Sequence, residues 1–418
     1  MVSLLSVGLT LGYFCSLFCS LGTMYSFGSW MPALKEDLDA GAAEVAAITG
    51  LFQTGFYLGS IPARFLLHHC THRGAYLLGG SLAAAVFFAV SFAESTWVLY
   101  FLFLAGSGMQ CAFMAAATLI PRHLSAPDTV TATAWGALGS GLGTIVWASL
   151  SAILLPKMGW RASFRILAAM FLAIHAVGAL GLQRPTQEAA GPPATKSPYS
   201  TLLTNSNFVR FAAALGFAYF GYLLPFDIQG LAAAQKGISS VHVSIAYTSF
   251  GVSSMAGRLL VGVVGRWIHP LHLLTASFVG VTASSAILAA AANFETLVSS
   301  NVLLGITSGP MVTLVVPSLR ELVPLSLIPD ALALALLPQA VSGAAPILAG
   351  WIAERSGSYL LGSLVGLAAL GVGIVLMAVV CWRHDASASS FHCDEGSTTD
   401  EGSVEASSSD EASDGRGL

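Results

Sequence analysis

The chain has 418 residues, of which 55% are hydrophobic and only 9% are charged, whereas a soluble globular domain carries roughly 25% charged residues. Together with a mean hydropathy of +0.76, this composition excludes a soluble enzyme, a disordered protein and a coiled coil. The formal net charge is −4, with many of the acidic residues in the last part of the chain, so the sequence offers no basic surface for nucleic acid.

Long apolar runs follow one another along most of the chain. A hydrocarbon core about 30 Å thick requires roughly 20 apolar residues per helix, and backbone groups inside lipid must be paired within their own segment. The first run has no basic segment before it and exceeds the length of a signal-peptide core, so we interpret it as a retained helix. We predict an all-α membrane protein with twelve transmembrane helices, over residues 6–31, 43–67, 75–93, 97–120, 129–155, 160–182, 207–232, 240–265, 271–292, 295–319, 326–352 and 358–382.

These twelve predicted helices divide into two sets of six. The longest internal polar stretch separates them, which predicts an N-terminal bundle over 1–183, a central cytoplasmic loop over 184–206 and a C-terminal bundle over 207–382. The second and eighth helices share a weak repeat, in which spaced glycines precede Arg64 in one and Arg266 in the other. Two six-helix repeats are typical of many secondary transporters.

The last segment, 383–418, is rich in serine and acidic residues. It contains too few apolar residues to fold, so we predict a disordered cytoplasmic tail, with a site for acid-directed kinases or trafficking adaptors as the alternative.

If both termini are cytoplasmic, the inner segments carry nine basic residues and the outer segments six, which agrees with the positive-inside rule. Because no organelle address is evident, the plasma membrane is the expected location.

Arg258 is the strongest single candidate for a functional residue. It lies inside the eighth predicted helix, where a charge costs several kcal/mol unless it is paired or hydrated. Its planar guanidinium matches a carboxylate through two parallel hydrogen bonds. We therefore expect Arg258 to bind an anionic substrate, with a structural arginine as the alternative.

Other polar residues in the predicted helices are weaker candidates. Asp227 follows Pro225 late in the seventh helix and is expected to pair with Arg258, to carry a proton or to face an outer vestibule. Tyr25 either lines the central cavity or belongs to an interfacial aromatic belt. The lone amides are interpreted as hydrogen-bond partners between helices or as ligand contacts, and Gln110 and Asn301 are the two that we include in the predicted site.

The sequence contains no catalytic constellation. The protease, hydrolase and nucleotide-binding motifs are absent, and the six cysteines form neither a disulfide framework nor a zinc motif. The run from His68 to His72 is interpreted as a solvated turn, with metal binding as the lesser alternative. Glycines at GxxxG spacing, densest between Gly136 and Gly143, predict close helix packing. No catalytic residue, metal or cofactor is therefore predicted.

Several of these segments, in their order, resemble the major facilitator superfamily, and within it the monocarboxylate-transporter-like and oxalate-transporter-like branch. They are residues 22–28, the glycine-rich run with Gly159-Trp160-Arg161 after it, residues 236–239, Gly257-Arg258 and residues 342–346. The resemblance implies transport of small carboxylates by alternating access, often together with a proton. It does not decide whether the chain works with an ancillary membrane subunit.

The chain also departs from that pattern. Animal members of the branch use a first-helix lysine and an eighth-helix Asp-x-x-x-Arg pair, but here the first span has no lysine and Ser254 stands four residues before Arg258. The acidic residue expected after the second helix is absent, with His68 nearby. Ser254 completes the predicted substrate-binding set of Arg258, Asp227, Tyr25, Gln110 and Asn301.

The predicted function is secondary active or facilitative transport of a small organic anion. One alternative is an amino acid or other small solute, with Asp227 binding the amine. Another is a membrane receptor or scaffold that signals through its acidic tail. Proton coupling is a separate expectation.

Overall fold

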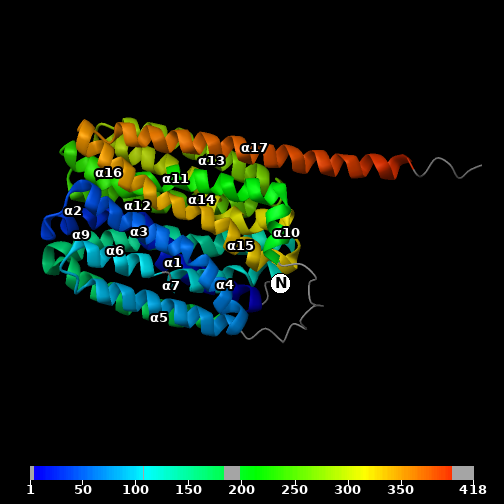
Figure 1. Cartoon of the computed structure of the whole chain (residues 1–418), viewed down its shortest axis with the longest axis horizontal. Helices are drawn as coiled ribbons and strands as arrows, with labels where there is room; N and C mark the ends of the chain where they lie inside the picture. Colours follow the sequence, from blue (N-terminus) through cyan, green and yellow to red (C-terminus); the bar gives the residue numbers. More distant parts are fainter. Residues whose placement is uncertain (1–3, 107, 183–197, 398–418) are drawn as a thin grey trace, which may run out of the picture.

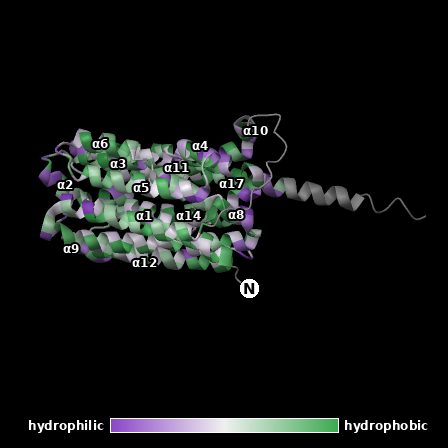
Figure 2. Ribbon diagram, turned by 90° about the horizontal axis from the view of Figure 1, so that it is seen from below, coloured by the Kyte–Doolittle hydropathy of each residue, from purple (hydrophilic) through white to green (hydrophobic). Residues whose placement is uncertain are grey.

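A computed structural model of the protein describes residues 4–106, 108–182 and 198–397, with side chains described up to residue 386. In these residues the chain is almost entirely helical, and most helices run side by side along the long axis of the molecule (Figure 1). Figure 2 shows hydrophobic residues along the sides of this bundle and hydrophilic residues mainly toward its ends. This distribution is the one that a bilayer requires.

The N-terminal half contains nine α-helices and one short 3₁₀ turn within the described residues. They are α1 (Leu4–Ser26), η1 (Phe27–Ser29), α2 (Met31–Asp37), α3 (Ala42–Leu58), α4 (Ser60–His69), α5 (His72–Val90), α6 (Thr96–Ala105), α7 (Gly108–Ala117), α8 (Ile120–His123) and α9 (Ala126–Leu180).

Helix α9 contains two helical segments joined at Gly159. The φ angle of Gly159 is 70°, in the left-handed region that glycine enters without a Cβ penalty. The segments before and after this residue correspond to the predicted helices over 129–155 and 160–182.

The C-terminal half follows the stretch 183–197, so the predicted central loop lies largely outside the described residues. Its elements are α10 (Pro198–Thr204), α11 (Ser206–Gln235), α12 (Ser240–Val264), α13 (Pro270–Ala290), α14 (Phe294–Leu322), η2 (Leu325–Leu327), α15 (Ile328–Leu336), η3 (Leu337–Gly343), α16 (Ala344–Ser356) and α17 (Leu360–Ser397).

Nine helical stretches of the described residues are long and apolar enough to cross a membrane. One of them is α9, with its two segments. The predicted helices over 43–67 and 240–265 correspond to α3 with α4 and to α12, which are not among the nine. The chain is a multi-pass membrane protein, and twelve crossings stay a prediction.

The predicted boundary of the acidic tail differs from the structure. Helix α17 continues beyond Arg383 to Ser397, where the sequence predicts a disordered tail from residue 383. Residues 398–418 lie outside the described part. Composition alone missed this extension because alanine and serine residues after Arg383 continue a helix that the apolar segment has already nucleated.

Glycine-rich packing joins α1 to α9. A Cβ added at Gly139 would lie 2.1 Å from the Phe14 carbonyl oxygen, and one added at Gly143 would lie 2.3 Å from that of Phe18. The Trp147 indole also donates to the Phe18 carbonyl at 2.9 Å. The glycines therefore permit a backbone approach that any side chain would prevent.

Candidate functional site

Arg258 lies at the interface of the two halves and is fully buried. Its Nη1 atom donates to the Ser254 hydroxyl, one helical turn earlier on α12. Gly141 of α9 approaches from the N-terminal half, since a Cβ added there would lie 3.3 Å from Nη1. In the part of the chain that the structure describes, Nε and Nη2 have no hydrogen-bond partner and no acidic side chain pairs with the guanidinium.

Four buried tyrosines lie within electrostatic range of this guanidinium. Tyr13 and Tyr25 come from α1, and Tyr219 and Tyr222 come from α11. The rings of Tyr25 and Tyr222 are 5.8 Å apart, centroid to centroid, and neither hydroxyl makes a hydrogen bond of good geometry with the described residues. The guanidinium therefore lies in an aromatic site with polar groups from both halves.

Sequence reasoning placed Tyr25 in this site but gave no role to the other three tyrosines. The spacing of Tyr219 and Tyr222 puts both on one face of a helix. A tyrosine deep in a membrane span, away from the interface, needs a partner for its hydroxyl group. Tyrosines spaced on one face of a predicted membrane helix, away from its ends, were therefore the feature of the sequence that indicated a polar site.

Asp227 is fully buried on α11, where it binds Gln53 of α3 rather than Arg258. The Gln53 Nε2 atom donates to both carboxylate oxygens, at 2.8 and 2.7 Å. Tyr57, one turn after Gln53, is within electrostatic range of the carboxyl group, and its hydroxyl has no partner among the described residues. Of the three roles open for Asp227, pairing with Arg258 is therefore excluded in this conformation.

The two predicted amides, Asn301 and Gln110, are buried but are not joined to Arg258 by any hydrogen bond in the described residues. Asn301 donates to the Gln229 side chain at 2.9 Å and to the Leu297 carbonyl at 2.8 Å, which ties α14 to α11. Gln110 of α7 has no partner for either amide atom within the described part of the chain. The Asn301 amide nitrogen is therefore held in a helix contact, while its Oδ1 atom and both amide atoms of Gln110 have no partner among the described residues.

Contacts between the two halves close the site at both ends of the bundle. At the end that holds Leu4 and α4, here called the N-terminal end, Arg64 pairs with Asp330 through Nε and Nη2 at 2.8 and 3.0 Å. The Arg320 guanidinium of α14 also donates to the Leu124 carbonyl at 2.7 Å. Figure 1 shows α4 and α15 together at this end.

At the opposite end, here called the α2 end, closure relies on backbone packing. A Cβ added at Gly50 of α3 would lie 2.1 Å from the Gly343 carbonyl oxygen. The Ala43 N–H donates to the Glu354 carboxylate at 2.9 Å. With contacts at both ends and Arg258 fully buried, the structure is closed on both sides.

The histidine run that begins in the last turn of α4 makes no ligand cluster in the described residues. His68 and His69 are exposed, as the solvated-turn interpretation expects. The three-residue group with metal-ligand spacing is elsewhere, formed by His269, Glu321 and His384.

Comparison with known proteins gives one family. The family model of the Major Facilitator Superfamily matches residues 13–324. The chain is 27% identical to monocarboxylate transporter 13 of Rattus norvegicus, over 85% of this chain and 84% of that protein. It is 28% identical to monocarboxylate transporter 11 of Homo sapiens, over 63% of this chain and 57% of that protein. It is 22% identical to monocarboxylate transporter 6 of Homo sapiens, over 75% of this chain and 68% of that protein.

Proposed function

Because the chain belongs to the Major Facilitator Superfamily and is a membrane transporter rather than an enzyme, we propose that it carries small organic anions by alternating access. The observation that carries the proposal is the buried guanidinium of Arg258, whose Nε and Nη2 groups have no partner in the described residues. Such a group costs free energy until an anion accepts its hydrogen bonds.

A monocarboxylate fits the chemistry of this site. Its carboxylate would accept two hydrogen bonds from the guanidinium, while its short apolar part would pack against Tyr25, Tyr222 and Phe250. The ring centroid of Tyr25 lies 5.8 Å from that of Tyr222 and 5.7 Å from that of Phe250. The names of the relatives point to the same substrate class. Because the identity to these relatives is low, the proposed substrate class rests mainly on the site.

We propose the plasma membrane as the location, with the N-terminal end of the bundle facing the cytoplasm. The excess of basic residues in the segments assigned to that side supports this orientation. The contacts at the two ends, Arg64 with Asp330 and Gly50 with Gly343, would then form the inner and outer gates.

Uptake into proteoliposomes tests the substrate class. A labelled monocarboxylate should enter saturably, and other small carboxylates should compete with it. The uncharged amide of the same acid should compete at least about 100-fold less well, because it cannot form the charge-assisted pair. Equal competition by the amide, or preferential uptake of amino acids, would overturn the assignment of an anion to Arg258.

We further propose that Asp227 carries the proton that accompanies the anion. It is a buried carboxyl group with no cation beside it in the described residues, held only by Gln53, and such groups form proton relays in transporters. Proton binding would remove its charge and weaken its attachment to Gln53, which would loosen α11 from α3.

The variant Asp227→Asn should therefore make transport insensitive to pH. Wild-type uptake should rise as the outer pH falls between about 8 and 5, whereas the variant should show a flat profile and no accumulation driven by a pH gradient. Asp39→Asn is the matched control, since Asp39 is exposed and asparagine tolerates its φ of 48°. An unchanged pH profile in Asp227→Asn would contradict the role of Asp227.

A further inference from the structure

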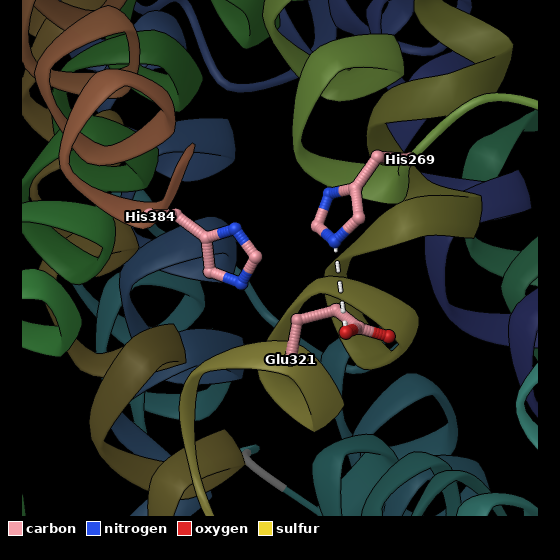
Figure 3. A group of neighbouring side chains, drawn as sticks. All are labelled: His269, Glu321 and His384. Carbon is pink, nitrogen blue, oxygen red and sulfur yellow. Dashed lines mark ion pairs between the residues drawn. The ribbon is translucent and has the colours of Figure 1, made fainter. Parts of the chain in front are cut away.

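Three side chains with metal-binding chemistry lie close together in the C-terminal half, at the end of the bundle that also holds Leu4 and α4. His269 precedes α13, Glu321 lies in the last turn of α14 and His384 lies on α17, so residues distant in sequence converge (Figure 3). One ligand atom from each lies within 4.8 Å of the others. The His269 Nε2 atom is 3.6 Å from the Glu321 carboxylate, and the rings of His269 and His384 are 4.8 Å apart.

Two imidazoles and one carboxylate form a ligand set that zinc-class ions prefer. Around a tetrahedral ion with bonds of about 2.1 Å, the ligand atoms lie roughly 3.4 Å apart. The His269–Glu321 distance of 3.6 Å already matches this spacing, and a ligand atom of His384 lies within 4.8 Å of both. The His269 Nδ1 atom accepts the Leu271 N–H at 3.4 Å, a long bond that an imidazole bound through Nε2 gives up at little cost.

A second pair beside the trio supplies further ligands and negative charge. His272 and Asp385 are in contact at 3.0 Å, and Asp385 also lies 3.8 Å from His384. Arg266 and Arg320 line the same surface cavity as His269 and Glu321, and the Arg320 Nη1 atom donates to the Pro121 and Leu124 carbonyls of the N-terminal half. Glu321 and Asp385 therefore offer two carboxylate ligands beside the imidazoles.

Water reaches the trio. The side chains of His269, Glu321 and His384 are 30%, 31% and 26% exposed. His269 and Glu321 also border a surface cavity of about 360 Å³. An ion in the aqueous phase can therefore enter without opening the bundle.

We propose that His269, Glu321 and His384 form a binding site for a divalent transition-metal ion of the zinc class, which fastens α17 to the ends of α13 and α14. The fourth position is open to water or to Asp385. The site is separate from the proposed anion site at Arg258, so it can be tested by measuring metal binding without measuring transport.

The full chain, purified in detergent through an affinity tag without histidine, tests the proposal by titration with cobalt(II). We expect one equivalent to bind, with the visible absorption of a tetrahedral or five-coordinate ion, and zinc to displace it. His269→Ala combined with His384→Ala should remove the absorption and weaken binding by at least about 100-fold, because even loss of an outer-shell partner costs about 10–100-fold.

The matched control replaces His68 and His69 by alanine, because these two neighbouring exposed histidines lie at the same end of the bundle. That variant should keep full binding. Glu321→Gln provides a second test in case the double histidine variant fails to fold, and it should weaken binding while its elution in size-exclusion chromatography is unchanged. Absence of cobalt binding to the wild type, or loss of binding with His68 and His69 rather than with His269 and His384, would overturn the proposal.

Discussion

Arg258→Gln is expected to abolish saturable anion uptake. The variant removes the charge and the planar pair of donors that face the substrate, which are worth roughly 3–6 kcal/mol for two charge-assisted bonds, so apparent affinity should fall at least about 100-fold. Arg258→Lys should restore part of the uptake at higher substrate concentration, because lysine keeps the charge but loses the two-point geometry. Initial rates in proteoliposomes over a range of substrate concentrations measure both effects.

Thermal unfolding separates this loss from misfolding. In the wild type without substrate, the Arg258 side chain is buried with Nε and Nη2 lacking partners among the described residues. Its replacement by a neutral side chain should leave the melting temperature unchanged or raise it, because a buried uncompensated charge is removed. Arg266→Gln is the matched control, since Arg266 follows α12 and is exposed, and it should keep normal uptake. Wild-type uptake by Arg258→Gln would remove Arg258 from the site.

Gly50→Leu is expected to stop transport by preventing closure at the α2 end. Even a Cβ at Gly50 would lie 2.1 Å from the Gly343 carbonyl oxygen, a contact that backbone atoms cannot relieve without separating α3 from η3. The closed conformation is therefore lost, while the anion site stays reachable from the α2 end. Substrate binding should persist, and uptake should fall to background.

A cysteine introduced at Thr54 reports this change. Thr54 is half-buried, lies one turn from Gly50 and donates to the Ala340 carbonyl of the other half at 3.1 Å, so its side chain belongs to the closed interface. In Gly50→Leu this cysteine should react faster with a membrane-impermeant thiol reagent than in the Gly50 background. Gly371→Ala is the control, because a Cβ at Gly371 meets nothing within 4 Å. Normal uptake by Gly50→Leu would show that transport does not require closure of this contact.

The sequence predicted the membrane class and the best candidate residue because both depend on local composition. Long apolar runs specify helices without any knowledge of their neighbours, and Arg258 is conspicuous as a charge inside one of them. Ser254 contacts it because four residues separate them on one helix. These inferences require only the spacing within a single element.

Contacts between distant segments were beyond sequence reasoning. Gln53 and Asp227 are 174 residues apart, and Arg64 and Asp330 are 266 apart. Composition indicates that each buried polar group needs a partner, but it does not choose among the candidates. For the same reason the sequence leaves Asp227 open as a partner for Arg258, and it does not bring His269, Glu321 and His384 together.

The unpartnered donors of Arg258 have a consequence for the direction of flux. When the empty protein closes at both ends, it buries a guanidinium that no acidic side chain of the described residues neutralises, whereas the protein loaded with the proposed anion would bury a neutral ion pair. We therefore expect the conformational change of the empty protein to be slower than that of the anion-bound protein. An anion that binds on the opposite side of the membrane should then speed the change back to the starting conformation. The protein should then perform one-for-one exchange faster than net movement down a gradient.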